Sequence, residues 1–198
     1  MFESELLADP IEQFGIWFEA ARAAGVAQPE AMALATASPE GQPSVRFVLL
    51  KSWDQRGFVF FTNRESQKGL ELLANPSAAL AIHWQPLGRQ FRAQGPVSLA
   101  TDEESDAYFD NRPRSSQISA AISPQSRPVP SREWLQEATI RFESQAAGGP
   151  VARPSNWGGF VILPEVIEFW EHQDDRLHDR LVYHREASGD WRRDRLAP

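Results

Sequence analysis

Short runs of β-prone residues, each closed by a turn signal, recur along most of this 198-residue chain. The run at residues 44–53 is followed by Asp-Gln-Arg-Gly, a hairpin-turn signal, and then by a run at 58–62. Strands do not alternate regularly with long helices, and the sequence contains no Gly-x-Gly-x-x-Gly. A doubly wound parallel sheet is therefore not expected. The pattern predicts an α+β fold, in which a small, mostly antiparallel, Greek-key-like barrel carries inserted helices.

We expect one domain over residues 1–198, with an N-terminal helical region at 1–25 and loops at 123–130 and 146–158. The helix of the first region begins at Asp9-Pro10, an N-cap followed by a proline at the first helical position. Further strands are predicted at residues 32–37, 78–84, 89–99, 160–163, 166–171, 181–186 and 191–196. Further helices are predicted at residues 66–74, 101–109 and 115–122 and from residue 131 to about 142.

Composition narrows the class of protein. A hydrophobic content of 41% with seven Trp and twelve Phe predicts a packed globular core. The formal charge of −7 opposes non-specific binding to nucleic acid, and the absence of Cys excludes disulfides and thiolate chemistry. The acidic N-terminus does not look like a signal peptide, and no apolar run approaches the roughly 20 residues that span a bilayer. We expect a cytoplasmic protein that does not enter membranes.

Lysine is nearly absent from the chain. Of twenty basic residues, eighteen are Arg and only Lys51 and Lys68 are Lys. A GC-rich genome explains the bias toward Arg, but it does not explain why two lysines remain. Because Lys is a compact point charge suited to a single phosphate oxygen, both lysines are candidate ligand contacts.

Lys51 ends a strongly apolar strand. Alternation along the strand places Arg46 and Leu50 on one side and Phe47, Leu49 and Lys51 on the other. A lysine on the apolar face of a central-looking strand is costly unless it is paired. The alternative is a strand end at which Lys51 emerges into solvent.

Lys68 lies in the first turn of a helix that Ser66 caps. The helix dipole disfavours a cation at this end, so a bound anion such as a flavin phosphate would account for the lysine. An ordinary surface helix is the alternative.

Tyr108, Arg112 and Ser116 are spaced by four residues and could form one stripe of phosphate-binding groups, bent at Pro113. The same spacing is also common on solvent-exposed helices, so it does not define a site by itself.

Arg176, His178 and Arg180 would share one face of an extended segment. Two guanidinium groups beside an imidazole favour an anionic or electron-rich ligand between them, although a solvated edge strand is the alternative. His172, His178 and His184 are six residues apart, which is about 20 Å per step in an extended chain. We therefore expect no metal site.

Taken in order, these segments resemble the pyridoxamine 5'-phosphate oxidase family. The resemblance runs from about Ala8 to Pro198, and it rests on the strand around Gln90 and on RFVLLK, FFTNRESQKG, YFDNRPRSSQISA, SPQS, WGGF, IEFWE, RLHDR and DRLAP. It implies an FMN-binding split barrel that forms a homodimer with two sites at the subunit interface. It also implies oxidation of the C4' amine or alcohol of pyridoxamine or pyridoxine 5'-phosphate. In that reaction a hydride passes to flavin N5, and dioxygen then reoxidises the flavin and is released as hydrogen peroxide.

The resemblance also assigns residues to roles. Arg46 and Lys68 would bind the FMN phosphate, and the other expected FMN contacts are Phe47, Val48, Leu49, Lys51, Phe61, Thr62, Gln67, Gln90, Trp170 and Arg180, with Gln125 and Ser126 from the second subunit. The substrate phosphate would be bound by Lys51, Tyr108, Arg112 and Ser116. Arg176 and His178 would cover the pyridine ring as the catalytic pair.

Two departures from the family pattern are visible. The family has Arg-Lys where this chain has Gln67-Lys68, so one phosphate charge is lost unless Arg64 substitutes. The family's longer N-terminal arm, which carries an Arg and a Tyr that close over the substrate, has no counterpart before Ala8.

Two alternatives remain open. A phenazine-type flavin oxidase tolerates Gln-Lys and acts on unphosphorylated tricyclic substrates, but it would not need the four phosphate-binding residues. A split-barrel protein that binds flavin or pyridoxal phosphate without turnover would not need Arg176 and His178.

Overall fold

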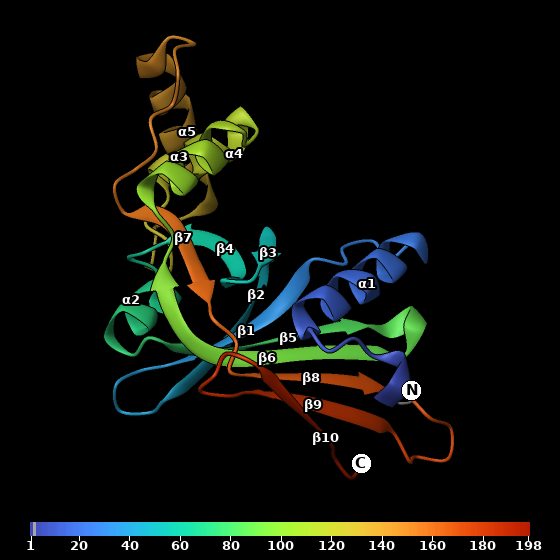
Figure 1. Cartoon of the computed structure of the whole chain (residues 1–198). Helices are drawn as coiled ribbons and strands as arrows, with labels where there is room; N and C mark the ends of the chain where they lie inside the picture. Colours follow the sequence, from blue (N-terminus) through green and yellow to red (C-terminus); the bar gives the residue numbers. More distant parts are fainter. Residues whose placement is uncertain (2) are drawn as a thin grey trace.

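A computed structural model describes residues 1 and 3–198 of the chain (Figure 1). Within this part the strands form one curled sheet in which every paired strand is antiparallel, in the order β10-β9-β8-β6-β5-β1-β2, with β3, β4 and β7 branching from it. The predicted split-barrel class is confirmed. The strands are β1 (Ala31–Ala37), β2 (Pro43–Leu49), β3 (Ser52–Asp54), β4 (Gly57–Asn63), β5 (Ser77–Trp84), β6 (Arg89–Leu99), β7 (Trp157–Ile162), β8 (Val166–Glu171), β9 (Asp179–Arg185) and β10 (Trp191–Arg195).

Five α-helices and two short 3-10 turns accompany the sheet in the described residues. They are η1 (Glu3–Glu5), α1 (Pro10–Ala23), α2 (Gln67–Ala74), η2 (Gln85–Leu87), α3 (Asp102–Asp110), α4 (Arg114–Ile122) and α5 (Arg132–Ala146). In Figure 1, α3, α4 and α5 gather at one end of the molecule beyond β7, whereas α1 lies over the strands at the other end. None of the described helices combines the length and apolar character that a bilayer crossing requires.

Strand β6 changes its pairing partner along its length. Its first half pairs with β8, while residues 97–99 at its end pair with β7. At this change of partner, the backbone at Gly95 lies very close to the backbone at Leu163. A Cβ on Gly95 would lie only 2.0 Å from the carbonyl oxygen of Leu163. Glycine is therefore required at this position.

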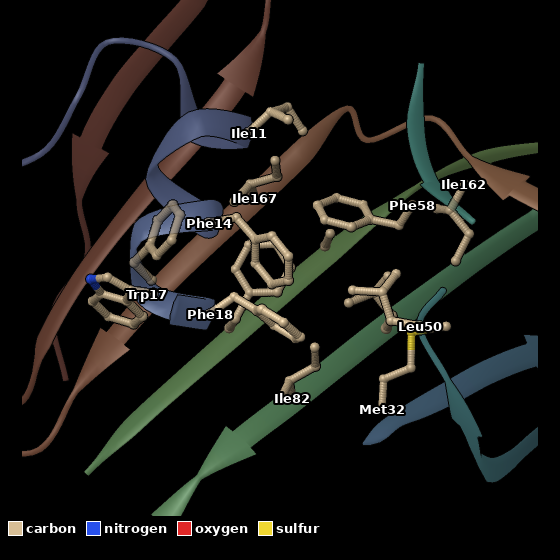
Figure 2. Close-up of a cluster of buried hydrophobic side chains, with 14 of the residues drawn as sticks. Ile11, Phe14, Trp17, Phe18, Met32, Leu50, Phe58, Ile82, Ile162 and Ile167 are labelled. Carbon is tan, nitrogen blue, oxygen red and sulfur yellow. The ribbon is translucent and has the colours of Figure 1, made fainter. Parts of the chain in front are cut away.

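The main core forms where α1 packs on the sheet. Asp9 caps the helix by accepting a hydrogen bond from the N–H of Ile11 (2.7 Å), as predicted. Phe14 is fully buried, and its ring centroid lies 4.4 Å from that of Phe91 and 5.1 Å from that of Phe58. Figure 2 shows Phe14, Trp17 and Phe18 on one face of the helix, directed at the strands. Burial of this aromatic face fixes the helix on the sheet.

The strand predicted at residues 44–53 is in fact two strands, β2 and β3. The N–H of Leu50 donates to the carbonyl of Glu30 beside β1, and the N–H of Lys51 donates to the carbonyl of Val59 on β4 (both 2.9 Å). The chain therefore changes partner between these two residues, which ends one strand and begins the next. Strand β2 lies at the edge of the sheet and is not central.

Two other boundaries differ from the prediction. The expected loop at 146–158 is shorter, because α5 continues to Ala146 and β7 begins at Trp157. The predicted strand 181–186 begins earlier, at Asp179, and ends at Arg185. The two-residue turn before Gly57 is confirmed, because Asp54 pairs with Gly57 across β3 and β4.

Candidate functional site

A cavity of about 450 Å³ opens between the edge of the sheet and the α3–α4 junction. The four residues expected to bind a substrate phosphate all line it, although Lys51 is far in the sequence from Tyr108, Arg112 and Ser116. The described lining consists of Val48, Leu49, Lys51, Phe61, Thr62, Asn63, Tyr108, Asn111, Arg112, Pro113, Ser116, Gln125 and Trp157. The cavity thus brings together a complete candidate anion site.

The α3–α4 junction positions three of these four side chains. The stripe is bent at Pro113, as expected, because α3 ends at Asp110 and α4 begins at Arg114, with Pro113 between the helices. Proline lacks the N–H that a continuous helix needs at that point. Tyr108, Arg112 and Ser116, on the two sides of this bend, all line one cavity.

Arg112 has no counter-ion in the described part of the chain. Its guanidinium carbon lies 4.7 Å from the ring centroid of Trp157 and 5.6 Å from that of Phe109, and Nη1 is buried without a hydrogen-bond partner among these residues. Burial lowers the pKa of Arg112, an effect that Tyr108 opposes. A buried donor without a partner is costly and indicates a ligand that would accept from it.

Lys51 provides a second cation. Its Nζ lies 5.8 Å from the ring centroid of Tyr108. The described lining of the cavity includes these two cations and contains neither Asp nor Glu. The described lining therefore carries a net positive charge, which a bound anion would neutralise.

A second group of cations lies next to this cavity. Lys68 is only 7% exposed, and its Nζ lies 3.3 Å from Oγ1 of Thr62 and 3.3 Å from Oγ of Ser66. Burial lowers the pKa of the Lys68 ammonium, Arg46 lowers it further, and Glu71 opposes both. Ser66 caps α2 by accepting from the N–H of Gly69 (3.3 Å), as predicted.

Arg46 forms an ion pair with the half-buried carboxylate of Glu71. Its Nη2 lies 3.3 Å from Oε2 of Glu71, and the same carboxylate accepts hydrogen bonds from Ser44 (2.6 Å) and Thr36. Burial raises the pKa of Glu71, but hydrogen bonds from Ser44, Thr36, Gln67 and Arg46 lower it to about 2. Arg46 is therefore held in place while Lys68 has no ion-pair partner among the described residues.

Gln67 does not reach toward Lys68, because its Nε2 donates to Oε1 of Glu71 (3.0 Å). Arg64, the expected substitute for the lost charge, packs instead against Gly158 and lies 3.9 Å from Asp102. The described contacts of Arg64 therefore do not support substitution at the Lys68 group.

Another set of predicted residues lies at the opposite end of β6. Gln90, Trp170 and Arg180 are cross-strand neighbours on β6, β8 and β9, and the Trp170 ring centroid is 4.7 Å from that of His178. Arg180 forms an ion pair with Glu168 (2.8 Å). None of these residues is in the described lining of the cavity.

Arg176 and His178 belong to the β8–β9 loop. The expected extended segment from Arg176 to Arg180 is wrong, because Arg176 has a left-handed φ of 66° and β9 begins only at Asp179. The loop folds back, and Nδ1 of His178 accepts a hydrogen bond from the N–H of Gln173 (3.1 Å). The ring centroids of His172 and His178 are consequently 5.1 Å apart, so the expected separation of about 20 Å was also wrong.

The remaining predicted residues divide between the cavity and the surface. Gln125 lines the cavity of its own protomer and accepts a hydrogen bond from Thr62 (3.2 Å), while its expected contact with FMN from the second subunit stays a prediction. Ser126 and Phe47 do not line the cavity, and Phe47 is 79% exposed on β2. Trp157 also lines the cavity but was not predicted as a site residue. Its position at the start of the WGGF motif could have identified it.

Two family models match separate parts of the chain. A family described as pyridoxamine 5'-phosphate oxidase matches residues 18–145, and one described as the pyridoxine 5'-phosphate oxidase C-terminal dimerisation region matches residues 157–198. A pyridoxine/pyridoxamine 5'-phosphate oxidase of Rubrobacter xylanophilus is 53% identical over 190 residues, which are 96% of this chain and 87% of that protein. A protein of the same name from Microcystis aeruginosa is 49% identical over 198 residues, covering 100% and 92% of the two chains.

Two solved structures are similar to the fold. PhzG from Burkholderia lata, in complex with tetrahydrophenazine-1-carboxylic acid, superposes with a TM-score of 0.94 at 32% identity, covering 100% of this chain and 98% of that one. An FMN-binding protein of Nostoc punctiforme related to pyridoxamine 5'-phosphate oxidase superposes with a TM-score of 0.77 at 17% identity, covering 97% and 98%. The second likeness concerns the fold alone.

Proposed function

Because this chain belongs to the pyridoxamine 5'-phosphate oxidase family, we propose that it oxidises pyridoxamine and pyridoxine 5'-phosphate to pyridoxal 5'-phosphate. Dioxygen is the acceptor and is reduced to hydrogen peroxide, and with the amine substrate water is also consumed and ammonia is released. FMN is the cofactor and supplies the two-electron redox chemistry when bound.

The unpaired Arg112 carries the substrate half of the proposal. A cavity that combines a buried, partnerless guanidinium nitrogen with Lys51 and lacks carboxylates in its described lining suits a doubly negative phosphate group. Tyr108 and Ser116 add hydroxyl donors on the same wall. Bound in this way, the phosphate would orient the substrate ring for reaction.

The Lys68 group fits the cofactor half. Lys68 is a buried ammonium without an ion pair in the described chain, and a phosphate between it and Arg46 would relieve their mutual repulsion. Thr62 contacts Lys68 and lines the substrate cavity, so the FMN phosphate and the substrate would lie on either side of its hydroxyl. In our proposal Gln67 adds no charge to this site, because its amide serves Glu71.

A second subunit would complete the site. Strand β2 presents an exposed apolar row of Val45, Phe47 and Leu49 at the edge of the sheet, which suits burial against another copy of the chain. We propose that the homodimer brings the group of Gln90, Trp170, Arg176, His178 and Arg180 from one subunit to the cavity of the other. Arg176 and His178 would then cover the substrate ring.

A phenazine-type oxidation is the second candidate. The Burkholderia lata structure contains a tricyclic acid without a phosphate, and this chain superposes on it closely. The four side chains that we propose to bind phosphate, in a cavity whose described lining contains no Asp or Glu, favour the phosphorylated substrate.

One assay separates the candidates. FMN-loaded protein is mixed with pyridoxamine 5'-phosphate, pyridoxine 5'-phosphate or tetrahydrophenazine-1-carboxylic acid, and aldehyde and peroxide are measured. We expect turnover with the two phosphates, and Arg112→Ala should raise their KM far more than the FMN Kd, because a charge-assisted contact worth about 1.5–3 kcal/mol is lost. Turnover of the tricyclic acid alone, or none at all, would refute the proposal.

A further inference from the structure

Three aromatic rings form a parallel group beside the two cations of the cavity. The rings of Phe61 and Tyr108 lie 4.2 Å apart at an interplanar angle of 10°, and those of Phe61 and Trp157 lie 5.5 Å apart at 10°. Tyr108 and Trp157 are 6.1 Å apart at 4°. We call Phe61, Tyr108 and Trp157 the ring group.

Each cation rests on a different member of the ring group. Arg112 lies over Trp157 at 4.7 Å, and Lys51 lies over Tyr108 at 5.8 Å. By contrast, Arg114, two residues after Arg112, pairs with the carboxylate of Glu143 at 2.8 Å. The fold thus uses a carboxylate to fix the neighbouring arginine but an aromatic face to fix the one in the cavity.

The net charge of the site depends on whether a carboxylate or an aromatic ring face fixes Arg112. A carboxylate would immobilise a guanidinium but would cancel its charge and repel a phosphate. A ring face attracts the cation through its quadrupole and adds no net negative charge. Arg112 can therefore be held in place while its full positive charge remains uncancelled and its Nη1 is left without a hydrogen-bond partner among the described residues.

We propose that Trp157 is a positioning residue that gives the site its preference for phosphorylated over unphosphorylated substrates. The inference rests on the proposed function, which supplies the phosphorylated substrate. Trp157 acts through Arg112, because its face fixes the guanidinium that would contact the phosphate. It is 5% exposed and also lies in a hydrophobic cluster with Phe109, Ile118 and Val151.

The test must separate this role from packing alone. Trp157→Leu removes the ring face, Trp157→Phe keeps one, and Val151→Ala weakens the same cluster at a residue with no ring to offer. For each FMN-loaded variant, kcat/KM is measured with pyridoxamine 5'-phosphate and with pyridoxamine, and the ratio of the two values is compared with that of the wild type.

We expect Trp157→Leu to lower this ratio about fivefold through KM for the phosphorylated substrate, with kcat little changed. Trp157→Phe should restore most of the ratio, and Val151→Ala should leave it within about twofold of the wild type, even at an equal loss of Tm. An unchanged ratio in Trp157→Leu, or an equal fall in Val151→Ala, would overturn the inference.

A failure of the proposed function is visible separately, because the wild type itself would then not turn over. In that case inorganic phosphate serves as the probe of Arg112. It should raise the Tm of the wild-type protein and of Trp157→Phe by more than it raises the Tm of Trp157→Leu. Equal increases in all three proteins would refute the positioning role whatever the reaction.

Discussion

The ammonium of Lys68 lies 3.3 Å from the hydroxyl oxygen of Thr62, and that contact joins the two cation groups of this protein. Thr62 lines the cavity that holds Lys51 and Arg112, whereas Lys68 lies behind it beside Arg46. In the proposed function, these two candidate anion sites, separated by one hydroxyl, would bind the cofactor phosphate and the substrate phosphate at the same time.

Removing the buried ammonium of Lys68 should have opposite effects on the stability of the protein and on its affinity for FMN. Because burial and Arg46 lower the pKa of Lys68 in the folded protein, the unfolded chain binds the proton more tightly, and the charge costs stability at neutral pH. Lys68→Met should therefore raise the Tm of the FMN-free protein while weakening FMN binding by about 1.5–3 kcal/mol. Thermal unfolding and fluorescence titration with FMN measure the two effects. A lower Tm with an unchanged FMN Kd would contradict the prediction.

Glu71 should govern part of the acid stability. Its pKa is about 2 in the folded protein against an ordinary value of 4.5, so its contribution is present above pH 4.5 and is lost as the pH falls toward 2. Glu71→Gln should remove that part of the pH dependence, and Tm measured across this range tests it. Glu103→Gln, at an exposed position on α3, is the control and should keep the wild-type slope.

Gly159 should be intolerant of even a methyl group. A Cβ at this position would lie 2.6 Å from Cβ of Ala100 and 2.8 Å from Cε1 of Phe61, so Gly159→Ala should destabilise the fold by about 1–3 kcal/mol. Gly15→Ala is the matched control, because its Cβ would approach only to 3.7 Å of Trp53 and it lies inside α1. That control should be neutral or stabilising by up to about 1 kcal/mol. Denaturant unfolding compares the two, and equal effects would rule out the steric explanation.

A charge on the exposed row of β2 should prevent dimerisation. Phe47 is 79% exposed in the single protomer, and Phe47→Glu would place a carboxylate in the proposed interface. We expect a monomer by sedimentation and the loss of turnover. Ile16→Glu, at another exposed apolar position, should remain dimeric. A dimeric Phe47→Glu protein would place the interface elsewhere.

Local patterns in the sequence predicted most of the fold. The N-cap at Asp9, the turn before Gly57 and the cap at Ser66 are all present, because each depends on residues adjacent in sequence. The edge position of β2 and the break at Leu50 depend on which strands pair, which no local pattern records.

The candidate site shows the same limit. Spacing by four grouped Tyr108, Arg112 and Ser116 correctly, although the helix between them is broken at Pro113. Sequence spacing gave the wrong geometry for Arg176 and His178, because it assumed an extended segment. The β8–β9 loop instead folds back, and Arg176 has a left-handed backbone conformation. Trp157 could not be ranked as a partner of Arg112 from the sequence, since their contact joins β7 to the α3–α4 junction.

The contrast between the two lysines also has a practical use. Lys51 is exposed at the cavity, whereas Lys68 is buried beneath Thr62. A lysine-directed label or surface-coupling reagent therefore has one accessible lysine, and it lies in the proposed catalytic cavity. The extent of labelling at Lys51 would therefore report on whether that cavity is occupied. An immobilisation meant to preserve turnover should use a chemistry that does not react with lysine.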